Sequence, residues 1–177
     1  PRPVWLLGWV SLFTDAGTEM IYPLLPVYLS QVLGVGAASL GVIEGVAEGL
    51  NSGLKLVSGH LSDRWRRRKP IAIAGYVLSS AARPFIGATT GWLQVLAIRA
   101  IDRTGKGIRG APRDAMLAQW TTAGTRGRVF GFHRAMDHAG AVIGPLIAAG
   151  ILLLMPGRFR LVFALSAIPG ALAVWTL

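Results

Sequence analysis

Residues 59–69 read Gly-His-Leu-Ser-Asp-Arg-Trp-Arg-Arg-Arg-Lys and lie between two long apolar segments, Leu40–His60 and Ile71–Thr89. Five of the six residues from Arg64 to Lys69 are basic. Lysine and arginine accumulate in the cytoplasmic loops of membrane proteins, so this arrangement predicts a cytoplasmic loop between two transmembrane helices. A nucleic-acid-binding surface is the other interpretation of such a basic run. The enclosing apolar segments argue against it, and we expect no nucleic-acid partner.

The composition of the whole chain supports a membrane protein. Of 177 residues, 53% are hydrophobic and only 15% are charged, whereas a soluble domain carries about a quarter charged residues. The same hydrophobic content excludes a disordered chain. The sequence contains no cysteine, which excludes disulfide scaffolds, thiolate zinc sites and cysteine nucleophiles.

Six apolar segments are long enough, or nearly so, to cross a bilayer core of about 30 Å. They are Val4–Leu29, Leu40–His60, Ile71–Thr89, Trp92–Trp120, Val129–Met155 and Leu161–Leu177. No linker or low-complexity segment divides the chain. The sequence therefore predicts one all-α domain over residues 1–177, a multi-pass bundle of six transmembrane helices.

The connectors between these segments predict the orientation of the bundle. Residues 34–39 and 89–91 carry no charge, whereas residues 64–69 and 121–128 are basic. Basic and uncharged connectors therefore alternate, which places both termini in the cytoplasm. Arg158 and Arg160 are an exception, because this orientation puts them on the outer side.

Ionisable residues inside the apolar segments are the most informative feature. Each charge at the bilayer centre costs about 2.5–3.5 kcal/mol, so these side chains must face the bundle interior, pair with one another or line a watery cavity. The residues that we assign to a proton or substrate pathway are Asp15, Glu19, Glu44, Glu48, Arg99, Asp102, Arg103, Lys106, Asp137 and His138. Further ionisable residues in the same segments are Lys55, Arg83, Arg109 and Arg134.

Helix rise places four of these residues, each from a different segment, at a similar depth near the bilayer centre. They are Asp15, Glu48, Arg103 and Asp137. With Glu19, the three acids among them are candidate proton carriers, and Arg103 is expected to bind an anionic group or to hold the charge state of a carboxylate. Asp102 and Lys106 are four residues apart, a spacing that allows them to neutralise each other locally.

Two interpretations of the charges remain open at this point. The acids of the first two segments either pair with the cations of the fourth and hold the bundle together, or they belong to a transport pathway, which intramembrane charges usually mark. The substrate class is open as well. The cationic fourth segment suggests an organic anion, and the acids suggest a cation.

Several other sites are disfavoured. His133 and Asp137 are four residues apart, as metal ligands on a helix can be, but two or three donors are weak evidence and we expect no metal. Gly105–Gly110 matches a dinucleotide fingerprint by letters but lacks the βαβ context, and close helix packing explains it better. No nucleophile elbow is present. We therefore expect neither a cofactor nor an enzyme.

The loop at residues 59–69 resembles the signature loop of the major facilitator superfamily, Gly-x-Leu-x-Asp-Arg-x-Gly-Arg-Arg. The matching residues are Gly59, Leu61, Asp63, Arg64, Arg67 and Arg68, and Arg66 departs from the usual glycine. Arg103, Lys106 and Gly107 are similar to the family's Arg-x-x-Gln-Gly. Gly140, Gly144 and Pro145 look like part of the antiporter motif Gly-x-x-x-Gly-Pro-x-x-Gly-Gly.

The resemblance implies the N-terminal half of a twelve-helix transporter, built of two inverted three-helix repeats and working by alternating access. The antiporter-like branch implies proton-coupled export in a bacterial inner membrane. The expected partners are lipid, a small solute, protons and a second six-helix half, which is a missing C-terminal half, another chain or a second copy. The rival is a membrane-embedded structural or assembly subunit, which would tolerate neutralisation of the midplane carboxylates.

The resemblance also implies a conformational latch. Asp63 and the arginines of its loop would form a charge cluster with Arg113 and Asp114, holding one conformation and releasing it in the other. Gly59 would let a helix of the other half approach closely. Gly144 and Pro145 would bend the fifth helix and allow tight packing.

Overall fold

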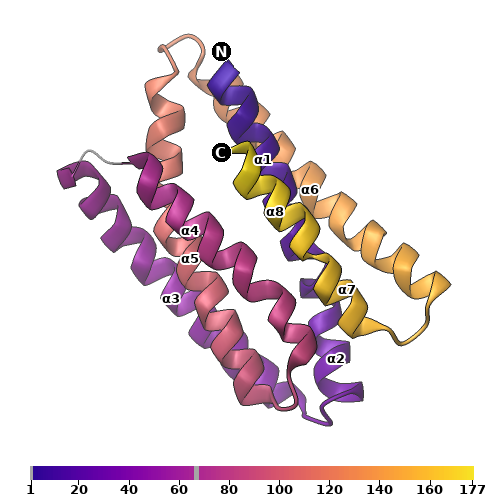
Figure 1. Cartoon of the computed structure of the whole chain (residues 1–177). Coiled ribbons are helices and arrows are strands. Elements are labelled where there is room, and N and C mark those ends of the chain that lie inside the picture. Colours follow the sequence, from indigo (N-terminus) through magenta and orange to yellow (C-terminus); the bar gives the residue numbers. More distant parts are fainter. Residues whose placement is uncertain (1, 66–67) are drawn as a thin grey trace.

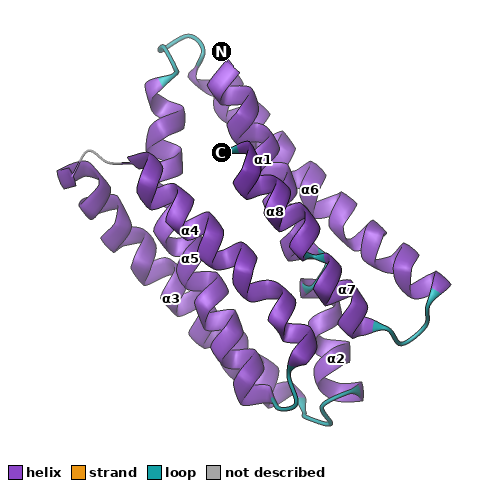
Figure 2. Ribbon diagram, in the orientation of Figure 1, coloured by secondary structure: helices purple, strands orange, loops and turns teal. Residues whose placement is uncertain are grey.

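The structure, a computed structural model, describes residues 2–65 and 68–177 and is helical throughout, with short connectors (Figure 2). Its elements are α1 (Arg2–Glu19), η1 (Tyr22–Leu24), α2 (Leu25–Gln31), α3 (Ala37–Trp65), α4 (Arg68–Ala82), η2 (Arg83–Ala88), α5 (Trp92–Gln119), α6 (Arg126–Leu154), α7 (Phe159–Leu165) and α8 (Ala167–Thr176). They form six long rods, each at the position of one predicted segment. The all-α fold class is confirmed.

Prolines divide three of the rods. A proline ring clashes with the carbonyl four residues earlier and removes one helical hydrogen bond. Accordingly, α1 ends at Glu19, four residues before Pro23, and α7 ends at Leu165, four residues before Pro169. The 3-10 segment η2 has Pro84 in its first turn. By contrast, α6 stays helical through Pro145.

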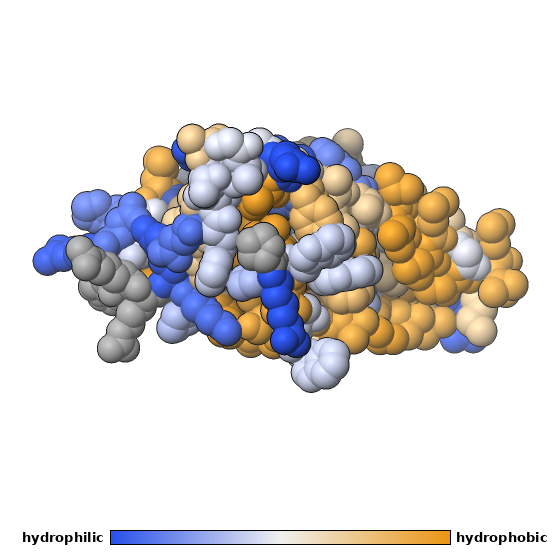
Figure 3. Space-filling view, turned by 90° about the horizontal axis from the view of Figure 1, so that it is seen from above, coloured by the Kyte–Doolittle hydropathy of each residue, from blue (hydrophilic) through white to orange (hydrophobic). Residues whose placement is uncertain are grey.

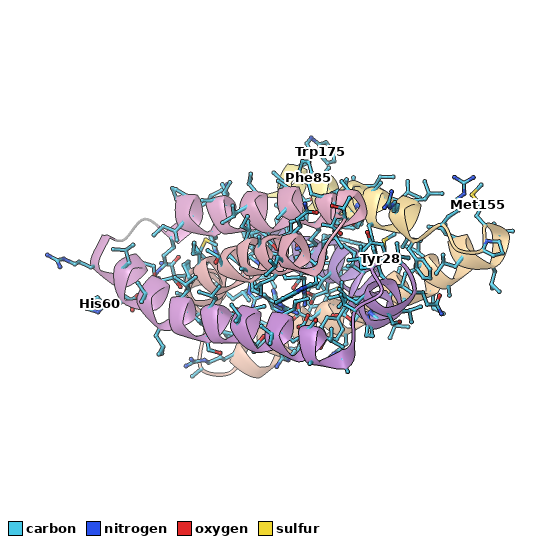
Figure 4. The ribbon with its side chains drawn as sticks, turned by 90° about the horizontal axis from the view of Figure 1, so that it is seen from below. Tyr28, His60, Phe85, Met155 and Trp175 are labelled. Carbon is cyan, nitrogen blue, oxygen red and sulfur yellow. The ribbon has the colours of Figure 1, made fainter. Side chains whose placement is uncertain are left out.

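Within residues 2–65 and 68–177, three rods are long and apolar enough to cross a membrane by length and composition alone. They are Arg68–Ala88, Arg126–Leu154 and Phe159–Thr176. The other three carry most of the ionisable residues discussed above, which lowers their hydropathy. Large apolar side chains such as those of Phe85 and Trp175 point away from the bundle (Figure 4) and are 64% and 86% exposed. Such a surface suits lipid.

The helix contacts repeat in a two-fold pattern. The rod of α1 and α2 packs along α6 and α8, while α5 packs along α3 and α4 (Figure 1). We number the rods one to six and exchange the first three with the last three, so that rod 1 takes the place of rod 4. The contacts of rod 1 with rods 5 and 6 then correspond to the contacts of rod 4 with rods 2 and 3. The contacts of α4 with α8 and of η2 with α7 join rods 3 and 6 and are unchanged by this exchange. The bundle thus has the contacts expected of two three-helix repeats.

Glycines allow the closest helix crossings. A Cβ added at Gly144 would lie 3.0 Å from the backbone nitrogen of Met20, and one at Gly140 would lie as close to that of Ala16. On α5, a Cβ at Gly105 would lie 2.7 Å from the nitrogen of Ser79, and one at Gly107 would lie 2.7 Å from a carbonyl oxygen of α3. The close contact at Gly144 agrees with the expected tight packing there, and the contacts at Gly105 and Gly107 agree with the helix-packing interpretation of Gly105–Gly110.

The two ends of the bundle differ. Both termini lie at the end that carries the α5–α6 connector and the facing ends of α3 and α4, and the connectors 32–36, 89–91 and 155–158 lie at the opposite end (Figure 1). Seen from the first end, hydrophilic residues gather on one side of the molecule and hydrophobic ones on the other (Figure 3). Arg158 and Arg160 lie at the opposite end. The predicted orientation places that end on the outer side, so these two arginines remain the exception to the pattern of basic connectors.

An apolar core closes that opposite end. Tyr28 is fully buried there, stacks edge-on against Phe163, and donates a hydrogen bond of 3.1 Å to the carbonyl oxygen of Thr89. Figure 4 shows Tyr28 inside the bundle. Polar side chains are instead buried in the middle of the bundle.

Candidate functional site

Four charged side chains form a buried ionic quartet, which we define as Glu44, Arg83, Arg99 and Asp102. Asp102 lies 2.9 Å from Nε of Arg83 and 3.2 Å from Nη1 of Arg99. Arg99 reaches on to Glu44, with Nη2 lying 2.8 Å from Oε1. Two arginines and two carboxylates balance, and only Glu44 is partly exposed, at 25% of its side chain. The quartet joins α3, α4 with η2, and α5 through matched charges.

Hydrogen bonds complete the quartet and attach it to α1. Ser79 donates to Asp102 at 2.5 Å and accepts from Nη2 of Arg83 at 2.7 Å. Nη1 of Arg83 donates to the carbonyl oxygen of Thr14 at 3.0 Å. Buried charges are stable only when paired and hydrogen-bonded in this way. Part of the predicted pathway therefore forms a charge-matched, hydrogen-bonded network.

The other charges line a cavity of about 260 Å³. Its wall is formed by α1, α3, α5 and α6, and its residues are Asp15, Glu19, Asn51, Lys55, Lys106, Arg109, Gly110, Arg113, Arg134, Asp137, His138 and Ala141. Three carboxylates and five cationic side chains thus face one space. Side chains from separate helices converge here, as expected for a pathway.

Asp137 sits at the junction of α6 with α1. It accepts a hydrogen bond from Ser11, one helical turn before Asp15 on the same face of α1. Asp15 and Asp137 both line the cavity. Nδ1 of His133 lies 3.6 Å and Nη1 of Arg134 lies 3.7 Å from Oδ2 of Asp137. Two carboxylates from α1 and α6 therefore face the same cavity.

Arg109 supplies a buried cation on the opposite wall. Its guanidinium lies over the ring of Tyr76, 4.4 Å from the ring centre, and the residue is only 3% exposed. Gly75 allows this stacking, because a Cβ there would lie 2.8 Å from Cβ of Arg109. Further along α5, Arg113 donates to Asp114 at 2.9 Å.

The predicted pathway residues divide between these two places. Asp15, Glu19, Lys106, Asp137 and His138 line the cavity, and Glu44, Arg99 and Asp102 belong to the quartet. Two predicted residues belong to neither. Glu48 is exposed and accepts a hydrogen bond of 2.8 Å from Asn51, and Arg103 is buried with its guanidinium 5.9 Å from the centre of the Tyr22 ring.

Two expectations about spacing are therefore corrected. Of the four residues at a shared depth, only Asp15 and Asp137 reach the cavity, because helix rise fixes the height of a side chain but not the direction in which it points. The local neutralisation of Asp102 by Lys106, which their spacing allows, is not observed. Asp102 is paired with Arg83 and Arg99, and Lys106 points into the cavity.

The predicted latch residues form two separate ion pairs in this conformation. Asp63 pairs with Arg68 at 3.2 Å, and Arg113 pairs with Asp114. In the described part of the chain, no ion pair within 4.0 Å joins one group to the other. Leu61 is half-buried and Arg64 is exposed. Arg67, like Arg66, lies outside the described residues.

Gly59 lies at a close contact within this chain. A Cβ at this position would lie 3.3 Å from Cβ of Ala111 on α5. The glycine thus allows α3 and α5 to approach closely, and its expected contact with a helix of the other half stays a prediction.

The quartet and the cavity also depend on buried residues to which the sequence analysis gave no role. Arg83 stood out only as a lone cation in an apolar segment, and nothing in the sequence pointed to its partners Ser79 and Thr14. Tyr76 and Ser11 carry no signal beyond a polar atom on a buried helix face. Across residues 2–65 and 68–177, no group of three or more histidine, aspartate or glutamate side chains is placed to hold a metal ion.

Comparison with known proteins agrees with this geometry. The family model of the Major Facilitator Superfamily matches residues 7–177. The chain is 35% identical over 173 residues to an uncharacterized MFS-type transporter of Methanocaldococcus jannaschii, with 98% of this chain and 43% of that protein covered.

More distant relatives include the multidrug resistance protein MdtH of Photorhabdus laumondii, which is 31% identical over 149 residues, covering 84% of this chain and 37% of that protein. The chain therefore spans less than half the length of these relatives. The match of the family model over nearly the whole chain, together with the repeated six-rod bundle, shows that the chain belongs to the Major Facilitator Superfamily.

Proposed function

We propose that this chain forms the N-terminal six-helix half of a secondary transporter, which exports a small solute by alternating access in exchange for protons. The observation that carries the proposal is the charged cavity between α1, α3, α5 and α6. Ionisable side chains that face a common space within a membrane bundle usually mark an ion or substrate pathway. The charges of the quartet, by contrast, are neutralised within the protein.

The proposed proton carriers are the carboxylates of the cavity, Asp15, Glu19 and Asp137. Asp15 and Asp137 face the same cavity, so one proton bound between them removes the repulsion of two negative charges. Ser11 can donate to an ionised Asp137 and accept from a protonated one. The junction of α1 with α6 is therefore suited to gain and lose a proton without losing its hydrogen bond.

A second six-helix half completes the cavity in this proposal, with both termini of the present half in the cytoplasm of a bacterial cell and the bundle in its inner membrane. The whole relatives are more than twice as long as this chain, which suits a second half of similar size. Basic side chains at the end with both termini support this orientation.

The latch is proposed to change partners between states. Asp63 and Arg113 are each held by a near neighbour in this conformation. In the alternative state Asp63 pairs with Arg113, which joins the end of α3 to α5. Exchange of partially exposed ion pairs costs little free energy, so it suits a reversible switch.

Reconstitution of the full-length protein in proteoliposomes tests the proposal. Solute-driven proton movement is measured with a trapped pH-sensitive dye, across a panel of organic anions and cations. Asp15→Asn and Asp137→Asn are expected to reduce this movement at least about tenfold, because each removes a titratable carboxylate. Arg128→Gln, at an exposed position of α6 outside the cavity, is the matched control for insertion. Unchanged proton movement in both carboxylate variants would remove Asp15 and Asp137 from the mechanism, and no solute-driven proton movement in the wild type would favour the structural-subunit rival.

A further inference from the structure

The cations of the cavity exceed the protein groups that neutralise them. Arg113 is paired with Asp114, and Arg134 lies near Asp137. Three cationic side chains of the cavity remain, and the described residues form no ion pair with them within 4.0 Å. They are Lys55, Lys106 and Arg109. Asp15 and Glu19 are the only other carboxylates in the wall, so the cavity keeps an excess of positive charge.

Arg109 is the best placed of these cations to bind a ligand. It lines the cavity and is 3% exposed, yet its Nη1 is buried without a hydrogen-bond partner. Stacking on Tyr76 fixes the plane of the guanidinium but satisfies none of its in-plane donors. A buried charged donor without an acceptor is costly, which an acceptor entering the cavity would relieve.

The neighbouring cations lie on the same side of the space. Lys106 is one helical turn before Arg109 on α5, and Lys55 of α3 packs with its aliphatic stem against Gly110, where a Cβ would lie 3.7 Å from Cε of the lysine. Arginine presents a planar fork that matches carboxylate and phosphate oxygens, and lysine adds a mobile point charge. The three together form an anion site built from two helices.

We propose that the cavity binds a small anion through a carboxylate or phosphate group, with Arg109 as its anchor and Lys106 and Lys55 as flanking cations. The inference deepens the proposed function, because the anion would be the transported solute. It chooses an anion over a cation, the question that the sequence leaves open. The acids of α1 and α6 lie on one side of the cavity, and the cations of α3 and α5 face the remaining space.

Ligand-induced stabilisation of the purified full-length protein in detergent tests this proposal without any transport. The melting temperature is measured at constant ionic strength against inorganic phosphate, succinate and salicylate, with tetraphenylphosphonium as the cationic comparison. At least one of the three anions is expected to raise the melting temperature, with an apparent affinity that falls at least about tenfold in Arg109→Gln. Arg109→Lys, which keeps the charge, is expected to retain part of the effect.

Controls keep this test independent of folding. If Arg109→Gln does not purify as a folded protein, Lys106→Gln takes its place with the same expected direction, and Arg128→Gln measures any effect of losing a surface cation. Stabilisation by tetraphenylphosphonium alone, by none of the anions, or equally in the wild type and the cavity variants overturns the proposal.

The outcome also separates this inference from the proposed function. Proton-coupled transport of a cation without anion binding would leave the function standing and remove the anion site. Anion binding without proton movement would do the reverse.

Discussion

Nε of Arg83 lies 2.9 Å from Oδ1 of Asp102, so a cation at the start of η2 meets a carboxylate on α5 where both side chains are almost fully buried. Arg99 binds the second oxygen of the same carboxylate. Asp102 therefore contacts two arginines from two rods. Glu44 supplies the second negative charge that is needed to neutralise them. These four residues join three of the rods through matched charges.

Asp102→Asn is expected to destabilise the fold by about 3–5 kcal/mol, because it leaves two buried arginines short of one negative charge. The measurement is the melting temperature of the purified protein in detergent. Glu44→Gln is the graded comparison, since Glu44 is partly exposed and water can compensate for its loss. A melting temperature for Asp102→Asn equal to that of the wild type would show that the quartet contributes no stability.

Gly140→Ala is expected to lower stability by about 1–3 kcal/mol, since the added methyl group would meet backbone atoms of α1 and force the two helices apart. Gly131→Ala is the matched control on α6. A Cβ at Gly131 meets no atom within 4 Å, and alanine favours a helix over glycine by about 1 kcal/mol. The two variants are therefore expected to shift the melting temperature in opposite directions.

Asp15→Asn is expected to reduce proton movement much more than Glu48→Gln. Helix rise gives the two residues the same depth, but only Asp15 lines the cavity, and Glu48 is exposed. The comparison uses dye-loaded proteoliposomes at equal protein content. Equal losses in both variants would mean that depth, rather than the cavity, identifies the proton carriers.

Asp63→Asn is expected to slow turnover while leaving the melting temperature nearly unchanged. Asp63 is 69% exposed in its ion pair with Arg68, and exposed pairs contribute about 0–1 kcal/mol to stability. Both quantities are measured on the same preparation, with transport normalised to the protein that has inserted. A variant that melts earlier and transports normally would give Asp63 a structural role only.

Sequence patterns predicted the six rods because apolar length is set by the thickness of the bilayer. They also predicted close packing at Gly144 and Gly105–Gly110, since small residues mark helix crossings. Membership of a transporter family confirms that the chain is not an enzyme. These features depend on local composition, which a single sequence displays fully.

The arrangement of the charges could not be predicted in the same way. Which carboxylate meets Arg83 depends on the rotation of two rods about their axes, and residue counting along one helix does not give that rotation. Counting also allowed Lys106 as the partner of Asp102, although two arginines bind this carboxylate. The breaks in the first and last rods could have been predicted from Pro23 and Pro169. In each case the helix ends at the residue four positions before the proline, whose carbonyl the proline ring would meet.

The balance of the quartet has a consequence for the response of the protein to membrane voltage. Glu44, Arg83, Arg99 and Asp102 sum to zero charge, so an electric field across the bilayer does no net work when they move together. The cavity groups do not sum to zero, and each uncompensated charge that crosses the field is worth about 2.3 kcal/mol per 100 mV. Electrical driving force therefore acts on the side chains that line the cavity and not on those of the quartet.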